Sequence, residues 1–166
     1  MKRNSYLVNT SDYGLRATCV GHSSFITHID FTADSANLRS TCGAHELLFW
    51  DCASGDQVTN GSSALRDTEW ATQTVPRGWS VEGVWYRGSD GTDINGVDAN
   101  HARQLLAAVD DLGRVLVYNY PTGKGATGNP LRGHSSHVTN VRWDALDKTL
   151  LTTGGNDRAI MQWRHV

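Results

Sequence analysis

One phrase occurs twice in this chain, in closely similar forms, and it constrains the fold more than any other feature. The first copy, GHSSFITHIDF, begins at Gly21, and the second, GHSSHVTNVRW, begins at Gly133. Each opens a segment with a strand pattern, a polar turn, a second strand pattern, a tight turn and a third strand pattern. Trp50 lies 29 positions after Gly21, and Trp163 lies 30 positions after Gly133. An order kept over that length indicates an internal structural repeat.

A third copy lies between the other two. Residues 105–121, LLAAVDDLGRVLVYNYP, again show strand, tight turn and strand, with Tyr118 where the other copies have Trp. We predict that SVEGVWY, residues 80–86, is the first strand of this copy and that residues 87–103 are an insertion. The strands ELLFW, RVLVY and AIMQW are mostly apolar. Such runs are typical of sheets that are covered on both faces.

Covered sheets that repeat every 40 to 45 residues or so, with Gly-His before the first strand and Trp after the third, resemble the blades of a WD-repeat propeller. The resemblance implies an all-β fold, a WD-repeat β-propeller that is partial, with about three four-stranded blades and two leading strands. The expected parts are the end of a preceding blade, a first blade, a blade with a long insertion, and a C-terminal blade. Their boundaries are residues 1–20, 21–61, 62–127 (insertion 87–103) and 128–166.

The resemblance also implies a hydrogen-bonded network that holds three strands of a blade in register. In the last copy the pattern is complete at His134, Thr153, Asp157 and Trp163. The Asp of the tight turn is expected to orient the His, and the Thr hydroxyl to link the imidazole to the indole N–H. Buried polar groups have to be paired, so a complete network stabilises the blade.

The first copy matches this pattern less well. His22, Ser40 and Trp50 correspond, but Ala44 stands where the Asp is expected. We therefore predict a weaker network in this blade. The middle copy has neither the Gly-His nor the Trp, and we predict that it lacks the network.

The repeated His-Ser pair has one chemical alternative, which is part of an esterase-type hydrolase site. The architectural interpretation explains both copies, so we assign no catalytic residues and predict that the protein is not an enzyme. No cofactor or metal site is assigned either. Two groups of metal-ligating residue types lack the required spacing. They are Asp90, Asp93, Asn95 and Asp98, and His22, His28, His45 and Cys42.

Charge and cysteine content narrow the partners. The net charge is −2 and the charged residues are spread along the chain, which favours neither nucleic acid nor membrane as a partner. The three cysteines have no metal-type spacing and are interpreted as reduced thiols in the cytosol or another reducing compartment. Three blades do not close a propeller, which needs about four to eight. We therefore expect the remaining blades to come from a longer parent chain or from a second copy.

Several further motifs go beyond a general WD repeat. They are HSSFITHIDF, DTEWAT, VWYRGSDGTDIN, HSSHVTNV and LTTGGNDRAIMQW. Together they resemble the C-terminal propeller region of the echinoderm microtubule-associated protein-like (EMAP-like) family, over about residues 15–166. The resemblance implies a cytoskeletal protein of the cytoplasm, associated with tubulin at the microtubule or axoneme.

The function predicted on this basis is that of a non-enzymatic scaffold, which presents loop surfaces to tubulin or microtubules. The candidate interaction loop lies in the insertion, because length added to a repeat usually maps to loops on one face. Its residues are Asp90, Thr92, Asp93 and Asn95. A loop that only caps the propeller is an equal alternative. The alternative function is a general protein-interaction propeller in a signalling or ciliary complex, without direct tubulin contact.

Overall fold

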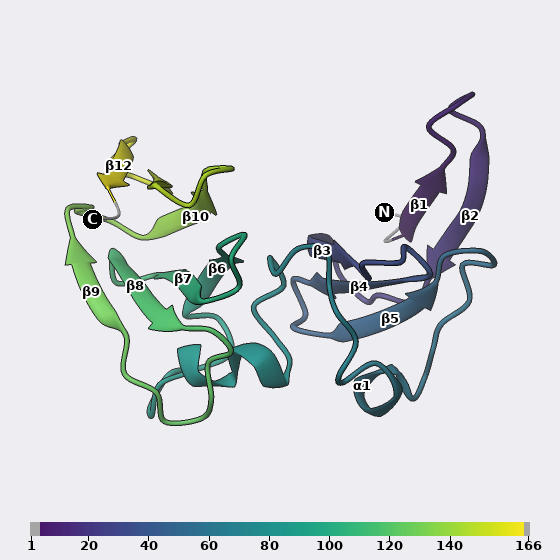
Figure 1. Ribbon diagram of the computed structural model, residues 1–166, viewed down its shortest axis with the longest axis horizontal. Helices are drawn as coiled ribbons and strands as arrows, with labels where there is room; N and C mark the ends of the chain where they lie inside the picture. The colour runs from purple at the N-terminus through teal and green to yellow at the C-terminus, as the bar shows by residue number, and fades with distance from the viewer. Residues whose placement is uncertain (1–3, 165–166) are drawn as a thin grey trace. The chain divides into compact units, whose positions relative to one another are not determined.

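The computed structural model describes residues 4–164, and it is an all-β structure, which confirms the predicted fold class. Within this range twelve strands form four antiparallel sheets (Figure 1). The chain divides after Val75 into two compact units. In the described part of the chain, no helix is both long enough and apolar enough to cross a membrane.

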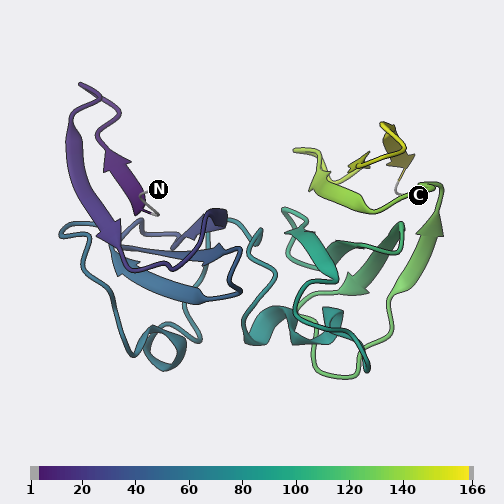
Figure 2. The ribbon, with the colours of Figure 1, turned by 180° about the vertical axis from the view of Figure 1, so that it is seen from behind.

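The first unit contains a two-stranded sheet, β1–β2, and a three-stranded sheet in the order β3-β4-β5. The short helix α1 lies beside β5 (Figure 1 and Figure 2). The elements are β1 (Asn4–Val8), β2 (Leu15–Val20), β3 (Ile26–Phe31), β4 (Asn37–Cys42), β5 (Leu47–Asp51) and α1 (Gly61–Ala64).

Both faces of the β3–β5 sheet are covered. On one face Leu38 and Trp50, which are paired in register, pack with Cys19 of β2. On the other face Phe49 lies against Trp70, with 6.2 Å between their ring centroids. Since side chains alternate along a strand, covered faces on both sides require apolar residues at nearly every position. This explains the apolar run in β5.

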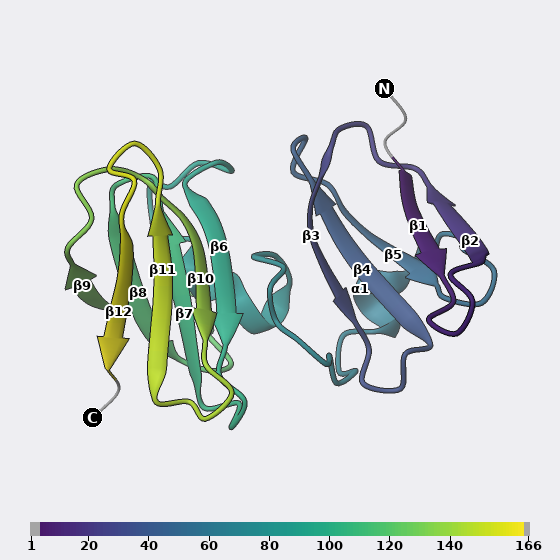
Figure 3. The same cartoon turned by 90° about the horizontal axis from the view of Figure 1, so that it is seen from above.

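The second unit consists of a four-stranded sheet, β6-β7-β8-β9, a three-stranded sheet, β10-β11-β12, and one 3₁₀ helix, η1. The two sheets lie one over the other (Figure 1 and Figure 3). The elements are η1 (Trp79–Val84), β6 (Ile94–Ala99), β7 (Leu105–Asp110), β8 (Arg114–Asn119), β9 (Asn129–Arg132), β10 (Val138–Trp143), β11 (Thr149–Gly154) and β12 (Ile160–Arg164).

The four-stranded sheet forms the middle layer of this unit. Leu106 of β7 packs with Val81 and Val84 of η1 in one apolar cluster. Val109 of the same strand faces the other way and packs with Val141 of β10. Alternate side chains of β7 therefore pack into two separate apolar clusters. All the residues named here are at most 1% exposed.

The predicted first strand of the middle copy, residues 80–86, is wrong, because this stretch contains η1. Val81 and Val84 are three residues apart, and that spacing places them on one side of a 3₁₀ helix. Gly83 is also bound to the loop after β8, where its N–H donates to the Thr122 carbonyl at 2.9 Å.

The prediction that residues 87–103 are an insertion between strands is wrong as well. This stretch contains β6, which pairs with β7 as the edge strand of the sheet. The added length of the middle copy instead precedes β6, in residues 52–93. The blade boundaries proposed from the sequence stay predictions.

Candidate functional site

The β10-β11-β12 sheet, called the last sheet from here on, carries a buried network around His134. The His134 side chain is 0% exposed. Its Nδ1 lies 2.8 Å from Oδ2 of Asp157, and its Nε2 lies 2.8 Å from Oγ1 of Thr152. The indole N–H of Trp163 donates to the same Thr152 oxygen at 2.9 Å. Both ring nitrogens are therefore occupied inside the sheet.

The bridging hydroxyl belongs to Thr152, which corrects the predicted Thr153. Because side chains alternate along β11, neighbouring threonines lie on opposite faces. Thr152 is 1% exposed and faces the buried side of the sheet. Thr153 faces the other side, where its hydroxyl lies 2.9 Å from that of Thr139.

The β3-β4-β5 sheet, called the first sheet from here on, has the same arrangement with different residues. His22 Nε2 lies 2.7 Å from Oγ of Ser40, and the Trp50 indole N–H donates to that oxygen at 2.8 Å. The acid is Glu46, whose Oε2 lies 3.3 Å from Nδ1 of His22. Sequence reasoning looked for an Asp at Ala44 and missed the Glu. A longer acidic side chain two residues further along the same turn was the available signal.

Glu46 is held as a carboxylate by several donors. The backbone N–H of Ser23 donates to it at 2.9 Å, the Cys42 thiol at 3.1 Å, and the Ser23 hydroxyl at 2.7 Å. These bonds lower the pKa of Glu46 from 4.5 to about 2. Asp157 has a lowered pKa too, chiefly because the Ala159 backbone N–H donates to it.

We expect the Glu46 carboxylate to make stability depend on pH in the acid range. The folded chain keeps Glu46 ionised down to about pH 2, whereas the unfolded chain protonates it near pH 4.5. The contribution of Glu46 is therefore complete above pH 4.5, and it is lost as the pH falls towards about 2. Urea unfolding at about pH 5 and about pH 3 should show a smaller loss in Glu46→Gln than in the unsubstituted chain. Glu69→Gln, at an exposed position, is the control, and an equal loss in all three chains would contradict the expectation.

The candidate interaction loop is held by local hydrogen bonds. Asp90 accepts hydrogen bonds from the backbone N–H and the hydroxyl of Thr92. Asp93 accepts from the Asp90 N–H and the Tyr86 hydroxyl, each at 3.1 Å. The Arg114 guanidinium lies over the Tyr86 ring, 4.7 Å from its centroid, and fixes the base of the loop to β8.

Asn95 does not belong to this loop. It lies in β6, where its amide N–H₂ donates to Asp111 Oδ1 at 2.7 Å and to the Val138 carbonyl at 3.0 Å. Its side chain thus joins the two sheets of the second unit. Of the four residues predicted for the loop, Asp90 and Thr92 are the two that are exposed.

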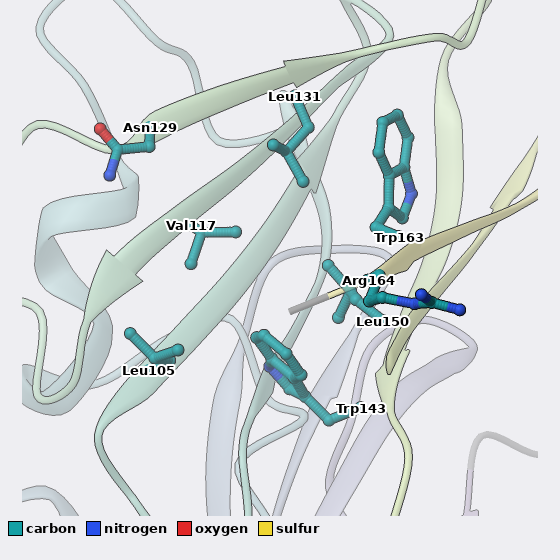
Figure 4. A pocket seen from close by; sticks show the side chains of 8 residues that line it. All are labelled: Leu105, Val117, Asn129, Leu131, Trp143, Leu150, Trp163 and Arg164. Carbon is teal, nitrogen blue, oxygen red and sulfur yellow. The ribbon is translucent and has the colours of Figure 1, made fainter. Parts of the chain in front are cut away.

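A cavity of about 310 Å³ lies beside β12 in the second unit (Figure 4). Within the described residues β12 pairs with β11 alone, whereas β8 of the neighbouring sheet has β9 on its outer side. Most of the lining is apolar. The lining residues are Leu105, Val117, Asn129, Leu131, Trp143, Leu150, Trp163 and Arg164.

Residues 3–165 match the family model described as the echinoderm microtubule-associated protein second beta-propeller. The chain belongs to this family. Members of the echinoderm microtubule-associated protein family with similar sequences come from several vertebrates. Echinoderm microtubule-associated protein-like 2 of Homo sapiens is 46% identical over 98% of the chain. The like-1 protein of Rattus norvegicus is 46% identical and the like-4 protein of Xenopus tropicalis 43%, each over 96% of the chain.

The chain spans only part of these echinoderm microtubule-associated proteins: 26% of the human, 20% of the rat and 18% of the Xenopus protein. Two solved propeller structures have a similar fold, and the chain again covers only part of each. The Cps50 (Swd1) beta-propeller domain of Myceliophteria thermophila has a TM-score of 0.68 at 15% identity, and 59% of it is covered. The C-terminal WD40 domain of Sif2 has a TM-score of 0.69 at 14% identity, and 50% of it is covered. The fold is thus that of a partial WD-repeat β-propeller.

Proposed function

We propose that the chain is part of a microtubule-associated propeller and acts as a non-enzymatic scaffold that presents loop surfaces to tubulin. The observation that carries this proposal is the family match over residues 3–165. The related proteins are named for association with microtubules. The proposed location is accordingly the cytoplasmic cytoskeleton, at the microtubule or axoneme.

The arrangement of the repeated His-Ser pairs supports a scaffold rather than a hydrolase. A general base needs a ring nitrogen that can reach a substrate proton. His134 is fully buried, and both its ring nitrogens contact partners within the sheet. His22 has the same two types of partner, an acid and a hydroxyl.

The tubulin contact proposed here is the exposed tip of the loop, Asp90 and Thr92. The loop has a defined shape because Asp93 accepts hydrogen bonds at its base from Tyr86 and from the Asp90 N–H. A preformed loop loses less conformational entropy on binding than a mobile one. Changing both exposed side chains removes the hydrogen bonds between Thr92 and Asp90 but leaves the Asp93 contacts at the base of the loop.

The missing blades are proposed to come from a longer parent chain, and the shares of the relatives that are covered support this source. The cavity beside β12 has the lining that an additional strand needs, with apolar side chains such as Leu131 and Trp163. A strand that pairs with β12 would place alternate side chains in this cavity. A second copy is the other source of such a strand.

Microtubule co-sedimentation tests the proposed function. We expect the chain to pellet with microtubules, and Asp90→Ala combined with Thr92→Ala to reduce the bound fraction several-fold. Asp67→Ala, at an exposed position of the first unit, is the matched control and should leave binding unchanged.

Failure of the unsubstituted chain to pellet, together with retained folding by circular dichroism, would contradict direct microtubule binding. That result would favour the general interaction propeller. Pelleting that the double variant leaves unchanged would place the contact on another surface.

A further inference from the structure

The end of the first sheet carries a thiol that the scaffold network does not require. The donor atoms of His22, Cys42 and Glu46 all lie within 4.8 Å of one another. Cys42 Sγ lies 3.1 Å and His22 Nδ1 lies 3.3 Å from the same carboxylate oxygen, Oε2 of Glu46. Three different metal-ligating groups therefore converge on one point, although the sequence analysis assigned no metal.

The last sheet shows which part of this cluster is additional. Cys42 pairs with the first residue of β3, and Gly154 has the corresponding place opposite the first residue of β10. A Cβ atom at Gly154 would overlap the Asp157 carboxylate and would lie 2.6 Å from Nδ1 of His134. A side chain at this position thus points directly at the pair of histidine and acid. The last sheet has a glycine there and the first sheet has a thiol.

We propose that His22, Cys42 and Glu46 form a binding site for a divalent ion of the zinc class. The ligand atoms are Nδ1, Sγ and Oε2, and a water molecule is the fourth ligand. Thiolate, imidazole and carboxylate are the three side-chain groups that Zn²⁺ takes in proteins. From ordinary Zn–ligand bond lengths, a tetrahedral site places N and O about 3.4 Å apart and S and O about 3.6 Å apart. The observed N–O and S–O separations are 3.3 Å and 3.1 Å, and all three donor atoms lie within 4.8 Å of one another, so the thiol has to move away from the carboxylate oxygen to reach this geometry.

Charge and protons balance in this site. The ion replaces the thiol proton of Cys42, which goes to solvent, and the thiolate and the Glu46 carboxylate together neutralise the two positive charges. The His22 ring stays neutral, with its proton on Nε2 directed at Oγ of Ser40. A hydroxyl oxygen has two lone pairs, so Ser40 Oγ can accept one hydrogen bond from the His22 Nε2–H and another from the Trp50 indole N–H.

The surroundings of the three ligands resemble the outer shell of a metal site. Ser40 fixes the His22 ring, and Ser23 fixes the Glu46 carboxylate through two hydrogen bonds. His22 and Cys42 are buried, whereas the Glu46 side chain is 34% exposed, which leaves one side open for the ion and its water. A bound ion would join the β2–β3 loop, the end of β4 and the β4–β5 turn.

Titration of the chain with Co²⁺ tests the proposal, because a thiolate bound to cobalt gives a charge-transfer absorption in the near ultraviolet. We expect this absorption in the unsubstituted chain, its loss on adding Zn²⁺, and its absence in Cys42→Ser. Cys52→Ala removes a thiol from the neighbouring core and should keep the absorption. Binding to other histidines gives no thiolate absorption, so the spectrum distinguishes the site from them.

Zinc affinity gives a second readout. Glu46→Gln keeps the thiol but loses a ligand, and Ser40→Ala removes an outer-shell partner, which typically costs about 10–100-fold in metal affinity. We expect Zn²⁺ to raise the Tm of the unsubstituted chain, and to raise it much less in Cys42→Ser and Glu46→Gln. Absence of the thiolate absorption in the unsubstituted chain would overturn the proposal. Equal zinc affinity in the unsubstituted chain and Cys42→Ser would overturn it as well.

Discussion

Replacing Asp30 with alanine is expected to lower the free energy of unfolding by about 3–5 kcal/mol, because it leaves a buried charge without its partner. The Asp30 side chain is 0% exposed and that of Arg39 is 4% exposed. Both Nε and Nη2 of Arg39 donate to Oδ2 of Asp30, at 3.1 Å and 3.0 Å. The Arg39 guanidinium also lies over the Trp70 ring, 4.1 Å from its centroid, so it cannot reach water without disturbing the core.

The same carboxylate holds the segment that follows Trp70. The Thr72 hydroxyl donates to it at 2.6 Å, and the N–H groups of Thr74 and Val75 donate at 2.8 Å and 3.0 Å. Loss of the carboxylate therefore removes the polar anchor of this segment as well as the ion pair. The backbone of this segment also bonds to β3, where the Ala71 N–H donates to the Phe31 carbonyl at 2.8 Å, so we expect the segment to detach from this edge of the sheet.

Urea unfolding of Asp30→Ala measures the effect, with the exposed Asp67→Ala as the control. Surface substitutions of that kind usually change stability by no more than about 0.5 kcal/mol. A second variant, Asp30→Leu with Arg39→Met, removes both charges and should be less destabilised than Asp30→Ala alone. If Asp30→Ala lost less stability than the double variant, the uncompensated charge would not be the cause.

The second large effect is expected for Trp50→Ala, at about 3–5 kcal/mol, which is usual for removing a large aromatic side chain from a core. Trp50 is 1% exposed and packs with Leu38, Cys19 and Cys52. Its indole N–H also donates to Ser40, the hydroxyl that lies 2.7 Å from His22. The substitution thus opens a cavity and breaks the network at one point.

Trp50→Phe helps to separate these two contributions, since it keeps one aromatic ring in the core and loses the pyrrole ring of the indole together with its N–H donor. We expect it to cost less than Trp50→Ala by an amount that reflects the cavity. Phe25→Ala, at a side chain that is 69% exposed, is the aromatic control and should stay close to the unsubstituted chain in thermal unfolding. Equal losses for the alanine and phenylalanine variants would show that the hydrogen bond, rather than the packing, decides stability here.

Buried Asp residues at the ends of β3 and β6 act in a similar way, which sequence reasoning did not reveal. Asp98 accepts the Trp143 backbone N–H at 2.7 Å, and Asp30 accepts that of Val75 at 3.0 Å, each across 45 positions. A buried Asp thus ties residues 70–75 to β3, and β10 to β6. In the sequence each Asp is only one polar residue in a strand pattern, and nothing nearby identifies its partner.

Features that depend on local order and on repetition could be predicted from the amino-acid sequence. The repeated Gly-His and Trp positions were sufficient for the all-β class and the partial propeller, because a repeat that stacks on its neighbours has to keep its turns and apolar strands at constant spacing. The family resemblance came from longer motifs such as VWYRGSDGTDIN and HSSHVTNV. The His22, Ser40 and Trp50 set was also visible, since each member has a fixed place in the repeat.

Other features depend on how the strands pack and could not be predicted from the sequence. Thr152 and Thr153 differ by one position, and a one-residue change of register exchanges the two faces of a strand, so their roles could not be separated in the sequence. Residues 79–84 form a 3₁₀ helix because Val81 and Val84 pack against the middle sheet, which overrides the strand-like alternation of residues 80–86. Glu46 reaches His22, and Arg39 reaches Asp30, because antiparallel pairing brings distant positions together. Long-range pairing of this kind depends on how the strands are arranged in space, and local sequence patterns carry little information about it.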